Sequence, residues 1–256
     1  MAKHRIAIIS ALALGVAACG GADAADSTAS DPAGEVLVSA AASLTDAFAD
    51  IEAAFEATHP KVDVILNLGG SSSLREQILE GAPVDVFASA NASNVARVVD
   101  EGLVAGTPQV FARNLLQIAV PSGNPAGITG LEDFAREDLL IGLCAEAVPC
   151  GAFARQALEN AQVTAAIDTN EPDVRALLTK IEAGELDAGI TYVTDVASTG
   201  GGVDGIDVPI DVNAAAEYPI ATLVDAPNPG AAAAFVAFVI SDEGRSILES
   251  HGFGTP

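Results

Sequence analysis

Two turns rich in small residues place serine hydroxyls between an apolar run typical of a strand and a run with helical spacing. One turn spans residues 40–44 and contains Ser43, and the other spans residues 69–74 and contains Ser71. Such a turn leaves the first N–H groups of the helix unpaired at the positive end of the helix dipole. Together with a serine hydroxyl, these groups form a neutral cradle of hydrogen-bond donors. The two turns therefore predict a binding site for a small anion.

The rest of the chain offers little catalytic chemistry. His4 lies at the N-terminus, His59 precedes Pro60, and His251 lies near the C-terminus. The sequence contains no Gly-x-Ser-x-Gly, His-Glu-x-x-His or Walker pattern. We therefore expect a binding protein and not an enzyme. The alternative from another class is an exported serine hydrolase with Ser71 as its nucleophile.

The composition restricts the class of partner. The chain has 256 residues, half of them apolar, which is enough for a substantial core in one large or two small domains. Its formal net charge is −24, with the acidic residues spread along the chain. Such a surface keeps a protein soluble and excludes nucleic-acid binding, which needs a basic face. In so acidic a protein, an anion can bind only where fixed local donors outweigh the general field.

The N-terminus resembles an export signal. Lys3 and Arg5 precede an almost unbroken apolar stretch at residues 6–18. This stretch is too short to span a bilayer, which needs roughly 20 residues. We therefore predict a signal peptide at residues 1–18.

Residues 16–19, Val-Ala-Ala-Cys, resemble a bacterial lipobox, in which Cys19 would be lipidated and become the mature N-terminus. The alternative is ordinary cleavage nearby, with Cys19 incidental. Residues 19–34 contain no large apolar side chain, which is typical of a flexible tether. We therefore expect a lipoprotein anchored outside the cytoplasm.

Two cysteines remain, Cys144 and Cys150. In an exported protein such a pair is typical of a disulfide. A metal site is the alternative, but no histidine lies nearby and two thiolates are too few ligands. We predict the disulfide and no bound metal cation.

Strand-like and helix-like segments alternate after residue 35. Apolar runs predict strands at residues 36–40, 62–66 and 84–88, and residues 45–58 carry an apolar stripe at helical spacing. Further strands are predicted at residues 115–120, 139–143, 188–192, 206–210 and 220–224. Further helices are predicted at residues 74–79, 93–99 (capped by Ser93), 152–158, 173–181, 231–240 and 243–250. The alternation predicts parallel α/β sheets covered by helices.

Seven motifs resemble, in their order, the substrate-binding proteins of molybdate ABC transporters. They are VSAAASLT at residues 38–45, GSSSLR at 70–75, GAPVDVFASA at 81–90, VPCG at 148–151, EPDVR at 171–175, GITYVTD at 189–195 and DEGRSILESHGF at 242–253. The resemblance implies a two-lobed α/β clamshell, the type II periplasmic-binding-protein fold, with two crossover strands. Lobe 1 would contain residues 35–116 and 225–256, and lobe 2 residues 117–224.

The resemblance also implies the ligand and its contacts. Molybdate or tungstate would lie between the lobes, held by hydroxyl and backbone N–H donors without a cofactor or a positively charged side chain. Ser43 and Ser71 would supply hydroxyl and N–H donors, Cys150 and Val174 a backbone N–H each, and Tyr192 its phenol. Cys150 stands where alanine is common in the family, so the predicted disulfide would brace the site. Another oxyanion receptor, for sulfate or phosphate, is the alternative.

The implied partner is the membrane permease of an ABC transporter. The protein would be a monomer that meets the permease while its lipid on Cys19 holds it to the membrane. A surface lipoprotein that binds other proteins is a third possibility, and it predicts no stabilisation by a small ligand.

Overall fold

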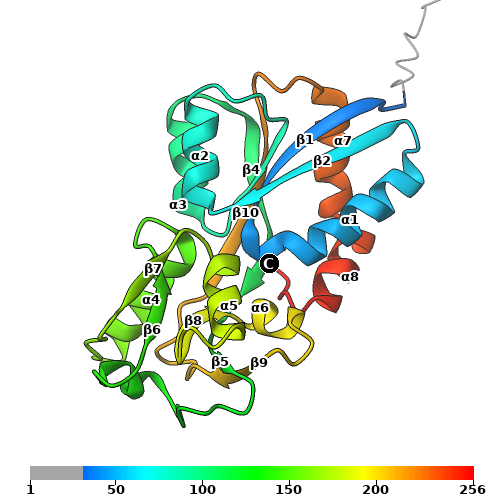
Figure 1. Cartoon of the computed structure of the whole chain (residues 1–256). Coiled ribbons are helices and arrows are strands. Elements are labelled where there is room, and N and C mark those ends of the chain that lie inside the picture. The colour runs from blue at the N-terminus through cyan, green and yellow to red at the C-terminus, as the bar shows by residue number, and fades with distance from the viewer. Residues whose placement is uncertain (1–30) are drawn as a thin grey trace, which may run out of the picture. The chain divides into compact units, whose positions relative to one another are not determined.

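Two five-stranded sheets form the framework of residues 31–256, which are the residues that the computed structural model describes (Figure 1). The predicted signal peptide, Cys19 and most of the predicted tether lie outside the described residues. No helix within residues 31–256 is long and apolar enough to cross a membrane.

The first sheet has its parallel strands at its centre and one edge. β1 (Gly34–Ala41) pairs in parallel with β2 (Val62–Gly69) and β3 (Val86–Ala88). β10 (Ala216–Leu223) is antiparallel to β3 and to β4 (Val104–Asn114). The resulting order is β2-β1-β3-β10-β4.

The second sheet repeats this mixture of directions. β6 (Ile141–Cys144) pairs in parallel with β7 (Thr169–Glu171) and β8 (Ala188–Tyr192). β5 (Leu116–Pro121) is antiparallel to β8 and to β9 (Val203–Asp207). The order is β7-β6-β8-β5-β9.

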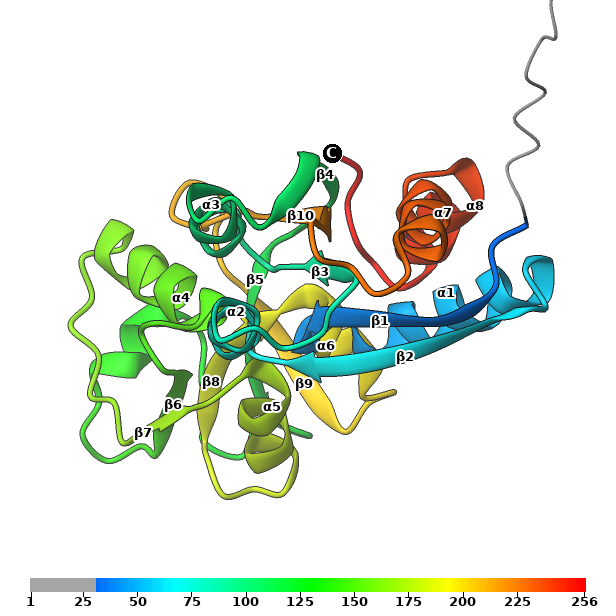
Figure 2. The ribbon, with the colours of Figure 1, turned by 90° about the horizontal axis from the view of Figure 1, so that it is seen from above.

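Helices cover both sheets, as the view from above shows (Figure 2). The first sheet is packed by α1 (Thr45–Thr58), α2 (Ser71–Leu79), α3 (Ala92–Asp100), α7 (Pro229–Val239) and α8 (Asp242–Ser250). The second sheet is packed by α4 (Pro149–Asn160), α5 (Val174–Glu182) and α6 (Val193–Ser198). Two short 3-10 helices complete the set, η1 (Ala42–Leu44) and η2 (Leu131–Ala135).

An aromatic cluster fills the core of the first sheet and its helices. Phe55 packs edge-on against Phe235, with ring centroids 5.3 Å apart, and Phe48 lies 5.9 Å from Phe111. The Tyr218 ring continues the cluster at 6.3 Å from Phe111. Edge-to-face contacts of this kind stabilise beyond simple area burial. They hold Tyr218 in a fixed position at the end of the cluster.

Several sequence predictions agree with the structure, and others are wrong. The helix at residues 45–58 and the strand at residues 188–192 have the predicted bounds. The sheets are mixed and not parallel, because β5 and β10 run against their neighbours. α3 is capped by Asn91 and not by Ser93: the Asn91 Oδ1 atom accepts the Asn94 N–H at 3.2 Å.

The longest strand, β4, is absent from the predicted strands. This edge strand is mostly exposed, so it lacks the apolar run that marks a buried strand. The chain passes from the first sheet to the second between β4 and β5, and it returns between β9 and β10. Residues 216–223 thus pair within the first sheet. Apolar spacing reveals a strand, but it does not reveal the strand's partners.

Candidate functional site

One small pocket collects the five residues expected to bind the ligand. It is lined by Ser43, Ser71, Cys150, Val174 and Tyr192, together with neighbouring turn residues. The first two follow β1 and β2 of the first sheet, the next two follow β6 and β7 of the second, and Tyr192 ends β8. All five therefore lie at the carboxyl ends of parallel strands, where α/β sheets bind ligands.

Helix N-termini form much of the pocket wall. Ser71 and Val174 are the first residues of α2 and α5, Cys150 is the second residue of α4, and Ser43 lies in η1. N–H groups in the first turn of a helix have no partner within that helix. They also lie at the positive end of its dipole. The wall is therefore suited to negative charge, although the chain as a whole is strongly acidic.

Two of the helices that begin at the pocket, α2 and α4, lack a side-chain cap within residues 31–256. Side chains cap α3, α7 and α8, through Asn91, Asn228 and Ser241. Among the described residues, no side chain caps α2 or α4, which follow Gly70 and Val148. A missing cap is costly unless another acceptor takes its place. The N–H groups at the pocket are thus left for such an acceptor.

α5 keeps a cap without losing its first N–H group. The Asp173 Oδ1 atom accepts the Ala176 N–H at 2.9 Å, two residues beyond Val174. The Val174 N–H is not used by this cap. The carboxylate of Asp173 is thereby occupied although the residue lines the pocket.

The Ser71 hydroxyl is set up to donate. Its Oγ atom accepts the Ala90 N–H at 3.1 Å in a buried contact. Because a backbone N–H can only donate, the Ser71 proton is not involved in this bond. The hydroxyl can therefore donate to a ligand in the pocket.

Tyr192 contributes a buried hydroxyl to the pocket region. Its side chain is fully buried, and no atom of the described residues forms a hydrogen bond with its Oη atom. Burial raises the pKa of Tyr192 well above its usual value, so the phenol stays neutral. An unsatisfied buried hydroxyl costs free energy that a ligand in the pocket would recover.

The predicted disulfide between Cys144 and Cys150 is present. It ties the last residue of β6 to the first turn of α4, directly behind the pocket wall. We expect the Cys144→Ala/Cys150→Ala protein to lose about 2 kcal/mol in its free energy of unfolding, because the bridge restricts a short loop of the unfolded chain. Urea unfolding measures this loss. Reductant should destabilise the wild type and not the variant. If wild type and variant are equally stable without reductant, the prediction is wrong.

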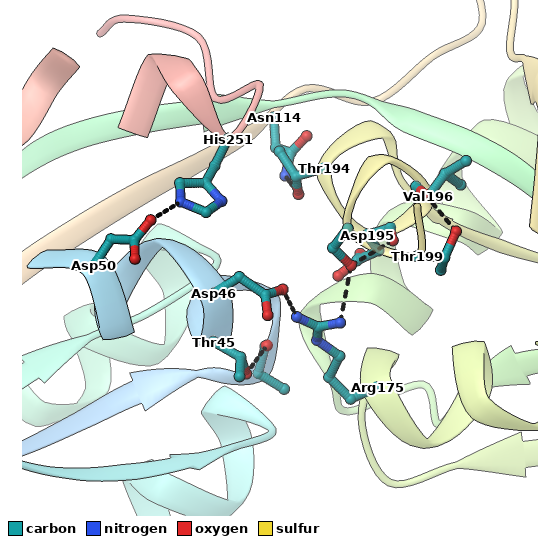
Figure 3. A network of polar contacts seen from close by, with 12 residues as sticks. Thr45, Asp46, Asp50, Asn114, Arg175, Thr194, Asp195, Val196, Thr199 and His251 are labelled. Atoms are coloured by element: carbon teal, nitrogen blue, oxygen red, sulfur yellow. Dashed lines mark hydrogen bonds and ion pairs between the residues drawn. The ribbon is translucent and has the colours of Figure 1, made fainter. Parts of the chain in front are cut away.

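Positive side chains near the pocket are committed elsewhere. Arg175 reaches from α5 to an ion pair with Asp46 of α1 (Figure 3). It also donates to the Ser198 Oγ atom at 2.9 Å. Arg75 pairs with Glu76 and donates to Asn94. Within residues 31–256, no lysine or arginine lines the pocket.

The histidines also lie away from Ser71. His251 pairs with Asp50, with 2.8 Å between Nε2 and Oδ2 (Figure 3), and His59 stacks on Phe55. Neither ring lines the pocket that contains Ser71. The described residues therefore give Ser71 no histidine base there.

Asp195 forms a hydrogen bond with the backbone of Tyr192. Its Oδ2 atom accepts the Tyr192 N–H at 3.0 Å, and its buried Oδ1 atom has no partner among the described residues. Burial raises the pKa of Asp195 from 3.8 to about 7, against the lowering effect of the Tyr192 N–H bond and of Arg175.

Because its pKa is raised, the Asp195 carboxyl should make the free energy of unfolding depend on pH. The folded protein holds the Asp195 proton up to about pH 7, whereas the unfolded chain releases it near pH 3.8. The contribution of Asp195 to the free energy of unfolding therefore falls as pH rises through this window, on the order of 4 kcal/mol at most. Asp195→Asn keeps the acceptor and cannot ionise, so it should gain stability relative to wild type between about pH 4 and about pH 8. If the free energies of unfolding of Asp195→Asn and wild type differ by the same amount at about pH 4 and at about pH 8, this prediction is wrong.

Two contacts of the site were not foreseen. The Ser43 Oγ atom lies 2.9 Å from the Tyr218 Oη atom, and Asn114 lies beside Tyr218 and Thr194. The only hint in the sequence is that Tyr218 is one of two tyrosines in the chain. Its distance from Ser43 along the chain hides the contact from local analysis.

The chain is similar to known proteins in both sequence and fold. A family model described as bacterial extracellular solute-binding protein matches residues 36–254. The molybdate-binding protein ModA of Mycobacterium tuberculosis H37Rv is 37% identical over 251 residues, which cover 96% of this chain and 95% of that protein.

Solved structures agree in fold. The periplasmic molybdate-binding protein of Azotobacter vinelandii has a TM-score of 0.78 at 16% identity, covering 86% of this chain and 99% of that chain. The sulfate-binding protein SubI of M. tuberculosis H37Rv has a TM-score of 0.76 at 19% identity, covering 86% of each chain. Because these two proteins differ in their ligands, the shared fold alone does not identify the anion.

Proposed function

Since the chain belongs to the family of bacterial extracellular solute-binding proteins, we propose that it binds molybdate or tungstate and delivers the anion to the membrane permease of an ABC transporter. The ligand would lie in the pocket between the two sheets. The protein acts by binding and release, without a cofactor and without catalysis.

The observation that carries this proposal is the buried hydroxyl of Tyr192, which has no hydrogen-bond partner among the described residues and lies in a pocket where α2 and α4 begin without a side-chain cap. Hydroxyl donors come from Ser43, Ser71 and Tyr192, and backbone donors from Cys150 and Val174. Hydrogen bonds to a charged acceptor are the strong ones, and a dianion gains most from several of them. Without a positive side chain, the fit of the closed pocket to the size of the anion sets the specificity.

The proposal includes two lobes that close on the anion. The first sheet with its helices forms lobe 1, and the second sheet with its helices forms lobe 2, so the return to lobe 1 precedes β10. The Asp46–Arg175 ion pair joins α1 to α5 across the closed cleft. A β-carbon built on Gly70 would lie 2.6 Å from the Pro172 carbonyl oxygen, which shows how closely the two sides approach. Bound anion would favour this closed form by population shift.

The proposal also covers the N-terminus and the partner. A signal peptide at residues 1–18 directs export, Cys19 carries the lipid, and residues 19–34 form the tether. The protein works outside the cytoplasm as a monomer, held at the membrane surface where the permease lies. The family and the lipobox-like sequence support this arrangement.

Calorimetric titration of the purified, ligand-free protein tests the proposal. Molybdate and tungstate should bind tightly with one anion per protein, and sulfate and phosphate should give no comparable heat. Equal affinity for sulfate and molybdate would make the protein a general oxyanion receptor. Silence from all four anions in folded protein would overturn the proposal.

A further inference from the structure

The direction of one hydrogen bond decides whether Ser43 can serve as a donor. The Ser43 Oγ and Tyr218 Oη atoms are 2.9 Å apart in a buried contact, and either could donate. A hydroxyl has a single proton. If Ser43 donates to Tyr218, it has no proton for an anion; if Tyr218 donates, the Ser43 proton is available.

Asn114 sets this direction. Its Oδ1 atom accepts the Leu115 N–H at 3.0 Å, which orients the amide. Its Nδ2 atom then lies 2.7 Å from the Thr194 Oγ1 atom and 3.5 Å from the Tyr218 Oη atom. An amide nitrogen can only donate. Tyr218 therefore accepts from Asn114, and among the described residues Ser43 is the acceptor in contact with Tyr218 that its own proton can reach.

Tyr218 is held so that it keeps its proton and stays beside Ser43. Its side chain is fully buried, and burial raises its pKa above the usual range, so the phenol keeps its proton. Edge-on packing against Phe111 and Phe253, with ring centroids 6.3 and 5.5 Å away, holds the ring in place. The hydroxyl can therefore neither ionise nor move easily away from Ser43.

The arrangement lies where the chain passes between the sheets. Asn114 is the last residue of β4, before the crossing into β5, and Tyr218 lies in β10, after the return. Thr194 belongs to α6 and lies beside Asn114 (Figure 3), two residues after Tyr192. The orientation of Ser43 is thus tied to contacts made by both sheets.

We propose that Asn114 and Tyr218 are positioning residues that form a one-way relay, from the Asn114 amide through the Tyr218 hydroxyl to Ser43, and that this relay turns the Ser43 proton towards the bound anion. The inference rests on the proposed function, because it requires an anion in the pocket. The Ser71 oxygen accepts from the Ala90 N–H, which leaves the Ser71 proton free to donate. In the relay, the Tyr218 hydroxyl does the same for Ser43.

A double-mutant cycle on molybdate affinity tests the relay. Tyr218→Phe keeps the packing and removes the hydroxyl, and it should weaken binding about tenfold. If Tyr218 acts through Ser43, Tyr218→Phe should have no further effect in Ser43→Ala protein. Tyr192→Phe is the matched control: its hydroxyl would act directly on the anion, so its effect should persist in the Ser43→Ala background.

Asn114→Asp provides a second variant should Tyr218→Phe fold poorly. A carboxylate accepts from Tyr218 and reverses the relay, so binding should weaken at least tenfold, again only when Ser43 is present. Wild-type affinity in either folded variant, or the same loss with and without Ser43, would overturn the relay alone. A wild-type protein that binds no oxyanion would instead overturn the proposed function, and the relay with it.

Discussion

Gly70→Ala should weaken molybdate binding by about 10- to 100-fold while leaving the protein folded. The Gly70 backbone, with φ −62° and ψ 129°, accepts any L-residue, so alanine causes no local strain. Its β-carbon, however, would lie 2.6 Å from the Pro172 carbonyl oxygen on the opposite side of the pocket. Overpacking of this kind costs about 1–3 kcal/mol, and here the cost falls on the closed form. The affinity falls with the population of that form.

Gly69→Ala is the matched control for this variant. A β-carbon there would meet its nearest atom, Leu74 Cδ2, at 3.8 Å, which is ordinary contact. Titration of both variants with molybdate, together with small-angle scattering with and without the anion, separates affinity from closure. Gly70→Ala protein that binds and compacts like the Gly69→Ala control would show that closure does not bring these residues together.

Ser71→Ala should weaken molybdate binding by about 10- to 100-fold. The variant loses a hydroxyl donor to a charged ligand, and hydrogen bonds to charged groups contribute about 1.5–3 kcal/mol. It also leaves the buried Ala90 N–H without its acceptor. Calorimetric titration measures the loss. Ser73→Ala is the control, because Ser73 lies two residues further along α2 and is exposed.

The same variant separates a receptor from a hydrolase. A receptor keeps a weakened, measurable affinity for molybdate without Ser71. A hydrolase with Ser71 as its nucleophile would lose ester turnover and show no such affinity series. Turnover of a generic ester by wild type, abolished in Ser71→Ala, would contradict the proposed function.

The local parts of this protein can be predicted from its amino-acid sequence. The turns at Ser43 and Ser71, the helix that begins at Val174 and the strand that ends at Tyr192 could all be predicted, because residue type and spacing govern structure over a few residues. The Cys144–Cys150 disulfide was predictable because two cysteines remain in a chain with an export signal, and the structure contains it. The order of the motifs then indicated the family.

Which of these parts come into contact, and which way their hydrogen bonds point, depends on the folding of the whole chain. Strand partners are chosen by packing across the whole chain, so the pairing of β10 with β3 and β4 could not be read from its apolar spacing. The Ser43–Tyr218 contact joins residues 175 positions apart, and the polarity of that bond depends on a third residue, Asn114. The pKa of Asp195 depends likewise on burial, which exists only once the chain has folded. Local spacing could name the donors of the site, but long-range packing sets where their protons point.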